Sequence, residues 1–358
     1  MLTQTIMEKE AREAPGVIEK QLLQNEGIWL TLAERLHKNP VPFAVTIARG
    51  SSDHAATFLK YLLEVKFGIP TVSAAPSVLT IYQKNLHLKG ALVIGVSQSG
   101  QSPDIVEMMR SARQSGAITV AIVNKENSLL AETSEYVIPI RAGVEEAVAA
   151  TKSYIGSLSA FLHFLAVYEK HLLKKQETFL ALQALPDLMR ETFSISWNDF
   201  SAKLFEVSSS VRQNSIILGR GFGYPIAQES ALKLKETCAL HAESFSSAEF
   251  LHGPLGLIQE AFPVILYLQD DQTIKSSLMT AKRIKEAGGS VFVISPQDLV
   301  EPDPSISTQV FWLPKSRHPL LDSVLGIAAF YPMVAKLSVL KGMNPDAPRL
   351  LKKVTETR

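Results

Sequence analysis

Three serines, a glutamine and a glycine lie together in the segment Ser97-Gln98-Ser99-Gly100-Gln101-Ser102-Pro103-Asp104. The segment follows the apolar run ALVIGV and precedes a helical pattern near IVEMMRSAR. Gly100 permits a tight turn, and a helix start offers unpaired N–H groups and the positive end of its dipole. The hydroxyls of Ser97, Ser99 and Ser102 add donors, so we interpret the segment as a phosphate-binding loop. A simple helix cap at Ser102 would need only one hydroxyl.

Two related turns help to define this loop. Gly50-Ser51-Ser52-Asp53 is a weaker version that follows another strand of the same predicted sheet. Loops that follow strands of one parallel sheet lie at the same edge, so Ser52 is expected to be a second phosphate contact. The corresponding loop of the second half, Gln269-Asp270-Asp271-Gln272-Thr273, carries two adjacent carboxylates, which would repel a phosphate.

Titratable side chains gather in the second half of the chain. The segment 226–247, IAQESALKLKETCALHAESFSS, is predicted to be helical, and Glu229, Lys233 and Glu236 in it share one helix face. His252 follows before Gly-Pro, where a loop is expected. A solvated row of Glu–Lys pairs is the ordinary alternative. The density of His and Glu just after a strand instead favours acid–base chemistry on C–H and O–H protons.

Other chemistries lack their sequence signatures. His241 and His252 do not have the HExxH spacing, and the one cysteine, Cys238, allows neither a disulfide nor a thiolate cluster. No GxGxxG follows the first strand, and no GxSxG motif occurs. The sequence therefore predicts no metal site and no cofactor.

An internal repeat indicates the elements that must position these residues. FAVTIARGSSDHAATFLKYLL near residue 43 matches NSIILGRGFGYPIAQESALKLKE near residue 214, with Arg49 and Arg220 separated by 171 positions. Each copy is a short apolar run, a polar turn and a long helical pattern. Apolar runs of this kind are typical of parallel strands buried on both faces. The fold class is therefore predicted to be α/β, with two tandem doubly wound, flavodoxin-like parallel sheets that carry helices on both faces.

The repeat also predicts the domain organisation. Residues 1–34 are expected to form a helical arm, 35–170 the first domain with the phosphate site, and 171–204 a helical connector. Residues 205–340 are expected to form the second domain with the acid–base residues, and 341–358 a tail that contributes to the site.

Composition narrows the partners. The 358 residues carry a net charge of +1 with no basic run, so neither nucleic-acid nor membrane-surface binding is predicted. No window reaches the roughly 18 to 20 unbroken apolar residues of a membrane helix, and the N-terminus MLTQTIMEKEAREA has no apolar signal core. A cytoplasmic location is therefore expected. A small anionic substrate needs only local positive potential, so the near-neutral net charge does not count against one.

The chain resembles the sugar-isomerase (SIS) family, in its tandem two-domain branch that includes the isomerase half of glucosamine-6-phosphate synthase. The resemblance runs from about residue 40 to the end. Its motifs are Arg-Gly-Ser-Ser at 49–52, SQSGQSPD at 97–104, AGVEEAVAATKSY at 142–154, LGRGFGYPIAQESALKLKE at 218–236, HAESFSSAEFLHGPLGLI at 241–258 and NPDAPRLLKKVTET at 344–357.

The resemblance implies roles for individual residues. Glu236 would move a proton between C1 and C2 of the sugar, and His252 would open the ring from the neighbouring subunit of a homodimer. Lys353 would border the reacting end, although a frayed tail lysine is the ordinary alternative. The expected substrate-binding residues are Ser52, Ser97, Gln98, Ser99, Ser102, Val148, Glu229 and Lys233.

Two departures from the family shape the expected activity. Arg49 replaces a cysteine that is common at the first turn, and the chain starts directly with the helical arm, without a glutaminase domain and its cysteine nucleophile. The resemblance then implies deamination of glucosamine 6-phosphate to fructose 6-phosphate and ammonia. A fructosamine-6-phosphate deglycase, a galactosamine-6-phosphate deaminase/isomerase and a non-enzymatic sugar-phosphate sensor remain alternatives.

Overall fold

Two five-stranded parallel sheets, one from each copy of the repeat, form the framework of this computed structural model, which describes residues 4–210, 214–299, 301 and 303–353. Contacts group 14–145, 152–183 and the tail from 352 into one unit, here the first-repeat unit. The second-repeat unit contains the residues up to 13, 146–151 and 184–351. The predicted domain boundaries were placed from the repeat in the sequence, whereas these units are defined by contacts between residues in space.

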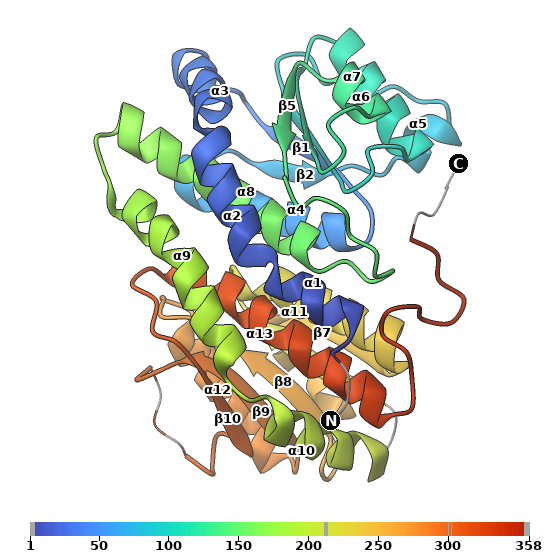
Figure 1. Ribbon diagram of the computed structural model, residues 1–358, viewed down its shortest axis with the longest axis vertical. Helices are drawn as coiled ribbons and strands as arrows, with labels where there is room; N and C mark the ends of the chain where they lie inside the picture. The colour runs from blue at the N-terminus through green and yellow to red at the C-terminus, as the bar shows by residue number, and fades with distance from the viewer. Residues whose placement is uncertain (1–3, 211–213, 300, 302, 354–358) are drawn as a thin grey trace. The chain divides into compact units, whose positions relative to one another are not determined.

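The sheet of the first-repeat unit has the strand order β2-β1-β3-β4-β5. Figure 1 labels β1, β2 and β5 of this sheet. Its strands are β1 (Ala44–Ile47), β2 (Thr71–Ser73), β3 (Leu92–Ser97), β4 (Ile118–Val123) and β5 (Tyr136–Pro139). All residues of β1, β3 and β4 are buried, as strands covered on both faces require. Ala44 pairs with Leu92, so β1 and β3 are neighbours and the loops after them leave the same edge of the sheet.

The sheet of the second-repeat unit repeats this order. Its strands are β6 (Asn214–Gly219), β7 (His241–Ser246), β8 (Pro263–Tyr267), β9 (Ser290–Pro296) and β10 (Gln309–Leu313). Read from β7, the spatial order is β7-β6-β8-β9-β10, which corresponds strand for strand to the first sheet. Both sheets therefore have the doubly wound order of flavodoxin-like folds, and the predicted fold class is confirmed.

Helices cover both faces of the first sheet. On one face α6 and α7 pack Met109 and Leu130 against Val93. On the other, Leu92 faces Trp29 of α3 and Phe161 of α8, because successive strand residues point to opposite faces. The helices of this unit are α2 (Ala14–Gln24), α3 (Glu26–Lys38), α4 (Ser51–Phe67), α5 (Ser77–Thr80), α6 (Pro103–Gln114), α7 (Leu129–Thr133) and α8 (Lys152–Leu172).

The second-repeat unit is built in the same way, with α11, α12 and α13 packed on its strands. Its elements are α1 (Ile6–Arg12), α10 (Asn198–Ser210), α11 (Gly223–Cys238), the short 3-10 helices η1 (Glu249–Leu251) and η2 (Pro254–Leu257), α12 (Ile274–Glu286) and α13 (Pro319–Leu340). Helix α9 (Glu177–Ser194) is shared between the two units.

The helix predicted over 226–247 is shorter than expected. Helix α11 ends at Cys238, Ala239 adopts the left-handed conformation with φ 48°, and the Leu240 amide donates to the Leu234 carbonyl. His241–Ser246 then forms β7, which pairs in parallel with β6. The strand was missed because its polar residues continue the Glu and His pattern of the helix, so periodicity did not separate the two.

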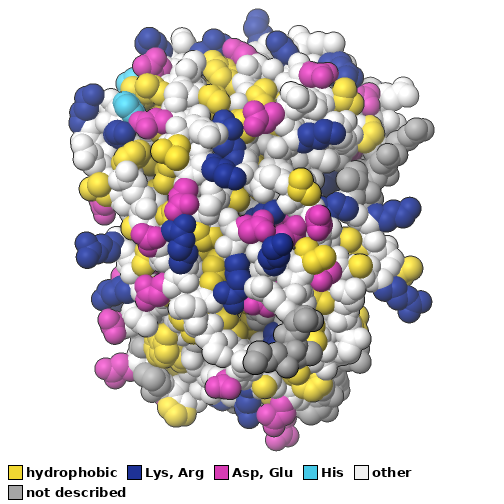
Figure 2. Space-filling view, in the orientation of Figure 1, with side chains coloured by type: hydrophobic (Ala, Val, Ile, Leu, Met, Phe, Trp, Pro, Cys, Tyr) yellow, Lys and Arg dark blue, Asp and Glu magenta, His cyan; other side chains and the backbone are white. Residues whose placement is uncertain are grey.

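Helix α13 is long and apolar enough to cross a membrane, with a mean hydropathy of 1.7 over an 18-residue window. In the structure 83% of that window is buried, against α10, α11 and strands of the second sheet. A helix that is apolar all round is typical of a core position. On the face shown in Figure 2, cationic and anionic side chains are interspersed, which agrees with the near-neutral net charge.

Candidate functional site

The serine-rich loop of the first-repeat unit folds back on itself at the end of β3. The Ser97 hydroxyl accepts a hydrogen bond from the Gly100 amide at 3.0 Å, and the Ser99 hydroxyl accepts from the Gln101 amide at 3.3 Å. The Gln98 carbonyl accepts from the Lys125 amide. Ser102 occupies the N-cap position of α6, but its hydroxyl makes no capping hydrogen bond. A role of Ser102 as a side-chain cap is therefore wrong, and its half-buried hydroxyl is not used by the helix.

Only glycine fits at the centre of this loop. Gly100 has φ +62°, and a β-carbon there would stand 2.2 Å from Oγ of Ser128. Ser128 caps α7 through the Ala131 amide, so it is fixed in place. The tight turn that exposes the loop thus depends on both the backbone freedom of Gly100 and the absence of its side chain.

We predict that Gly100→Ala weakens binding of inorganic phosphate at least about 10-fold, because the loop must move away from Ser128 and its donors lose their alignment. Calorimetric titration of the folded variant measures this. The matched control is Gly116→Ala, which introduces a β-carbon at a similar φ of +85° but with no contact closer than 3.7 Å. Equal phosphate affinity in both variants would contradict the assignment of the loop.

An ion pair connects the two turns that were expected to share a ligand. Arg49, after β1, donates from Nη2 and Nε to Oδ2 of Asp104 at 2.9 and 3.1 Å. The Asp104 side chain is buried, whereas that of Arg49 is 52% exposed. Ser52 lies three residues further on, in the first turn of α4, and is half-buried. The arginine that departs from the family pattern therefore joins the first turn to the start of α6.

The tail lysine is held rather than frayed. Lys353 Nζ lies 2.9 Å from Oε2 of Glu145, and both belong to the first-repeat unit. The Glu145 side chain is fully buried and also accepts from the amide and the hydroxyl of Ser153, at 3.1 and 2.8 Å. Glu145 was not among the expected site residues. Its signal was a carboxylate among the small residues of AGVEEAVAATKSY.

Helix α11 of the second-repeat unit carries a buried cluster of charges. Lys233 Nζ lies 3.2 Å from Oε1 of Glu229 and also donates to Oε2 of Glu236. Burial alone lowers the pKa of Lys233, but the two carboxylates outweigh it and hold that pKa above its ordinary value, so the ammonium stays charged. Lys233 and Glu229 are completely buried, whereas 22% of the Glu236 side chain is exposed. Glu236 is therefore the member of the cluster that can reach a substrate.

The other two expected residues of this unit lie in irregular segments. His252 is exposed and directly follows η1, before Gly253 with φ 128°. Val148 is half-buried, and its amide donates to the Asp346 carbonyl at 3.1 Å. The structure thus places Glu229, Lys233 and Glu236 in one ion-paired cluster on α11, whereas His252 and Val148 belong to other segments of the unit.

The loop that corresponds to the phosphate loop in the second repeat is anionic. Oδ1 of Asp271 accepts from the amide and the hydroxyl of Thr273, and the Asp270 amide donates to Oδ2 of Asp322 on α13 at 2.9 Å. Burial, together with the charges of Asp270 and Asp271, raises the pKa of Asp322 to about 6 despite its hydrogen bonds from Asp270 and Ser316. Three carboxylates at this strand end make it unlike the serine-rich loop after β3.

Comparisons with known proteins agree with this architecture. The SIS domain model matches residues 43–167 and 210–339, so the chain belongs to the SIS domain family and carries two copies of the domain. It is 31% identical over 354 residues to the glutamine–fructose-6-phosphate aminotransferase [isomerizing] of Sulfurisphaera tokodaii, covering 97% of this chain and 56% of that protein. The chain therefore spans little more than half the length of such relatives.

Two solved structures are also similar. One is a protein from Silicibacter pomeroyi described as a candidate phosphosugar isomerase, with 36% identity, a TM-score of 0.84, and coverage of 96% of this chain and 100% of that chain. The other is the C-terminal domain of glucosamine-fructose-6-phosphate aminotransferase from Francisella tularensis, with 25% identity and a TM-score of 0.83. The similarity extends over 97% of this chain and 99% of the Francisella tularensis chain.

Proposed function

We propose that the protein is a sugar-phosphate aldose–ketose isomerase that converts glucosamine 6-phosphate and water into fructose 6-phosphate and ammonia. The observation that carries this proposal is the cluster on α11, in which a charged, buried Lys233 holds a partly exposed Glu236 beside a buried Glu229. A carboxylate fixed in this way is suited to moving a proton between two adjacent carbons of a bound sugar.

The phosphate group of the substrate is assigned to the loop after β3. Ser97, Gln98, Ser99 and Ser102 would contact it together with Ser52, and the N-terminus of α6 would favour its charge. Binding energy from the phosphate would position the carbon end for reaction. The Arg49–Asp104 ion pair would keep the two turns in register.

The acid–base steps are assigned to Glu236 and His252. His252, donated by the second subunit of a homodimer, would protonate the ring oxygen as the pyranose opens to the aldehyde. Glu236 would take the proton from C2 to give an enolamine and return it to C1, which leaves an imine at C2. Water would then hydrolyse the imine and release ammonia. Val148, Glu229, Lys233 and Lys353 would border the sugar, the last held by Glu145.

The direction of reaction is proposed from the co-reactant, because deamination needs only water. Cys238 has no role in it, since burial raises the pKa of its thiol to about 12 and suits it to packing. The homodimer and a cytoplasmic location remain predictions.

The test is to incubate the purified chain with glucosamine 6-phosphate, galactosamine 6-phosphate and a fructosamine 6-phosphate, and to measure ammonia and fructose 6-phosphate. We expect equal amounts of both products from the first compound. A reaction in D₂O should also place deuterium at C1 of the product where the carried proton exchanges with solvent. Release of a free amine from the third compound, with nothing from the other two, would replace this proposal with a deglycase.

A further inference from the structure

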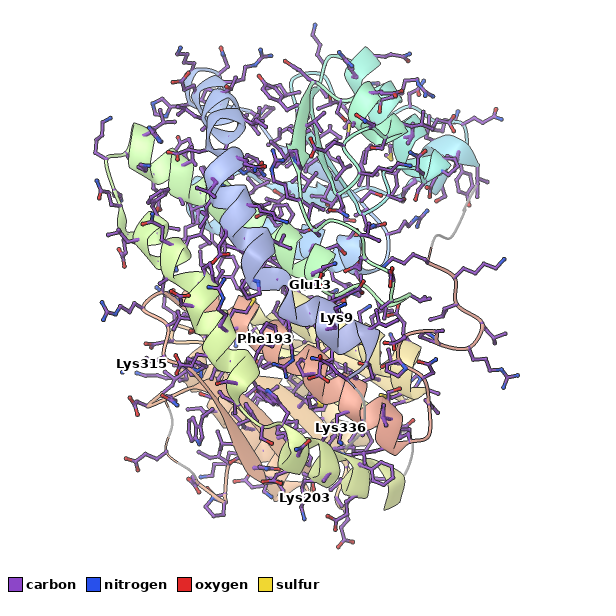
Figure 3. All side chains as sticks on the ribbon, viewed as in Figure 1. Lys9, Glu13, Phe193, Lys203, Lys315 and Lys336 are labelled. Atoms are coloured by element: carbon purple, nitrogen blue, oxygen red, sulfur yellow. The ribbon has the colours of Figure 1, made fainter. Side chains whose placement is uncertain are left out.

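One cavity of the second-repeat unit has no residue of the α11 cluster in its lining. It has a volume of about 450 Å³, within the range of small-molecule sites. Its walls are helix α1, the turn between α9 and α10, and helix α13 (Figure 3). Its polar lining includes Glu8, Arg12, Ser194, Ser196 and Lys336. None of these residues has a role in the proposed deamination.

The charges in this cavity favour an anion. The Arg12 guanidinium is held by Oε1 of Glu8, at 2.8 Å from Nη2, and by the Phe193 carbonyl, at 2.6 Å from Nη1. Lys336 on α13 is half-buried, and among residues 4–210, 214–299, 301 and 303–353 its ammonium group forms no hydrogen bond or ion pair. Glu8 balances one of the two cations. The lining therefore keeps one positive charge that a bound anion would neutralise.

Part of the remaining lining is apolar. Pro332, Ala335 and Val339 of α13 line the cavity on the same helix as Lys336, and Trp197 lines it from the turn before α10. Such walls favour an organic body attached to the charged group, since binding it removes apolar surface from water. A bare inorganic ion would leave most of the volume to water.

Helix α1 connects this cavity to the segment that carries Val148. Thr5, Glu8 and Arg12 line the cavity, whereas the buried Glu10 carboxylate accepts hydrogen bonds from the amides of Glu146 and Ala147. Asp346 accepts from the first two amides of the same helix, at 3.0 and 2.8 Å, and its carbonyl accepts from Val148. A shift of α1 would therefore change the hydrogen bonds of residues 146–148 and of Asp346.

We propose that this cavity binds a small organic anion, either a carboxylate or a phosphate ester. Binding there would act through α1 and change the strength of the hydrogen bonds made by the amides of residues 146–148. An effect of the anion on catalysis rests on the proposed function, because it requires that Val148 borders the sugar. Binding and coupling are properties of the second-repeat unit and hold whatever the reaction is. Coupling of this kind is reciprocal, so a substrate contact at Val148 would change anion affinity by the same factor.

Binding is tested by calorimetric titration of the full chain with succinate, phenyl phosphate and inorganic phosphate. We expect phenyl phosphate or succinate to bind, and Lys336→Gln to weaken that binding about 10-fold, which is the loss of one charge-assisted hydrogen bond. The matched control is Lys203→Gln, an exposed lysine of α10 that does not line the cavity. Tighter binding of succinate would identify the ligand class as carboxylates, and tighter binding of phenyl phosphate would identify it as phosphate esters.

The cavity is excluded as an anion site if no probe binds, or if Lys336→Gln and Arg12→Gln/Lys336→Gln bind every probe as the unchanged chain does. Inorganic phosphate also reports on the loop after β3, and binding there should survive both variants. The melting temperature of each variant verifies that it is folded, which matters for Arg12 because it fixes Phe193.

Coupling is tested by hydrogen–deuterium exchange of the amides of Glu146 and Ala147, with and without the probe that binds. We expect their exchange rates to change several-fold on addition of the probe, and not in Lys336→Gln at the same concentration. Unchanged exchange at a saturating concentration of a bound probe would overturn the coupling through α1. This measurement needs no substrate, so failure of the proposed deamination would leave it intact.

Discussion

Glu236→Gln is expected to lower turnover of glucosamine 6-phosphate by about 10³-fold or more, while sugar-phosphate binding stays nearly unchanged. The amide retains an oxygen that can accept from Lys233, so the cluster on α11 keeps its shape. It cannot take a proton from C2. Measurement of kcat and of binding by titration separates the two effects.

The control for this variant is Glu243→Gln, the same change at an exposed glutamate of β7. It should leave kcat within a factor of about two, since surface changes away from the site have small effects. A Glu236→Gln enzyme with normal turnover at saturation, but poor binding, would make Glu236 a binding residue and remove the proton carrier from the mechanism.

Lys233→Met is expected to cost about 3 to 5 kcal/mol of stability, because it leaves the fully buried Glu229 carboxylate without its cation. Urea unfolding measures this penalty as the loss in the free energy of unfolding relative to the unchanged chain.

Two further variants complete this experiment. Lys235→Met places the same change at an exposed position of α11 and should cost less than about 0.5 kcal/mol. Lys233→Met/Glu229→Gln should recover part of the loss, because the unpaired charge is gone. Equal stability of Lys233→Met and Lys235→Met would show that the Lys233 ion pairs contribute nothing to the fold.

The fold was predictable because its signals are local and repeated. Arg-Gly follows closely after each of the runs at 44–47 and 214–219, and both runs form the first strand, in chain order, of a sheet with the same topology. The serine loop was predictable for the same reason: its hydroxyls, its glycine and the helix after it are contiguous in the sequence. The one-face placement of Glu229, Lys233 and Glu236 followed from helical spacing.

The contacts that the sequence did not reveal join distant positions. Lys353 and Glu145 are 208 residues apart, and Arg49 and Asp104 are 55 apart, so no spacing rule relates them. Strand β7 was missed for another reason, because an edge strand with exposed polar side chains has no apolar pattern of its own. Local periodicity indicates which face of an element is buried. It gives no information on the distant residues that the fold brings into contact with that element.

The buried thiol of Cys238 has a practical use. Maleimides and related reagents react with the thiolate, and at neutral pH a group with a pKa near 12 in a closed interior supplies almost none of it. A fluorophore or spin label aimed at one cysteine introduced on the surface, for instance at the exposed Lys203, should therefore attach there alone. Spectroscopic probes can be placed on this chain without first deleting a native residue from its core.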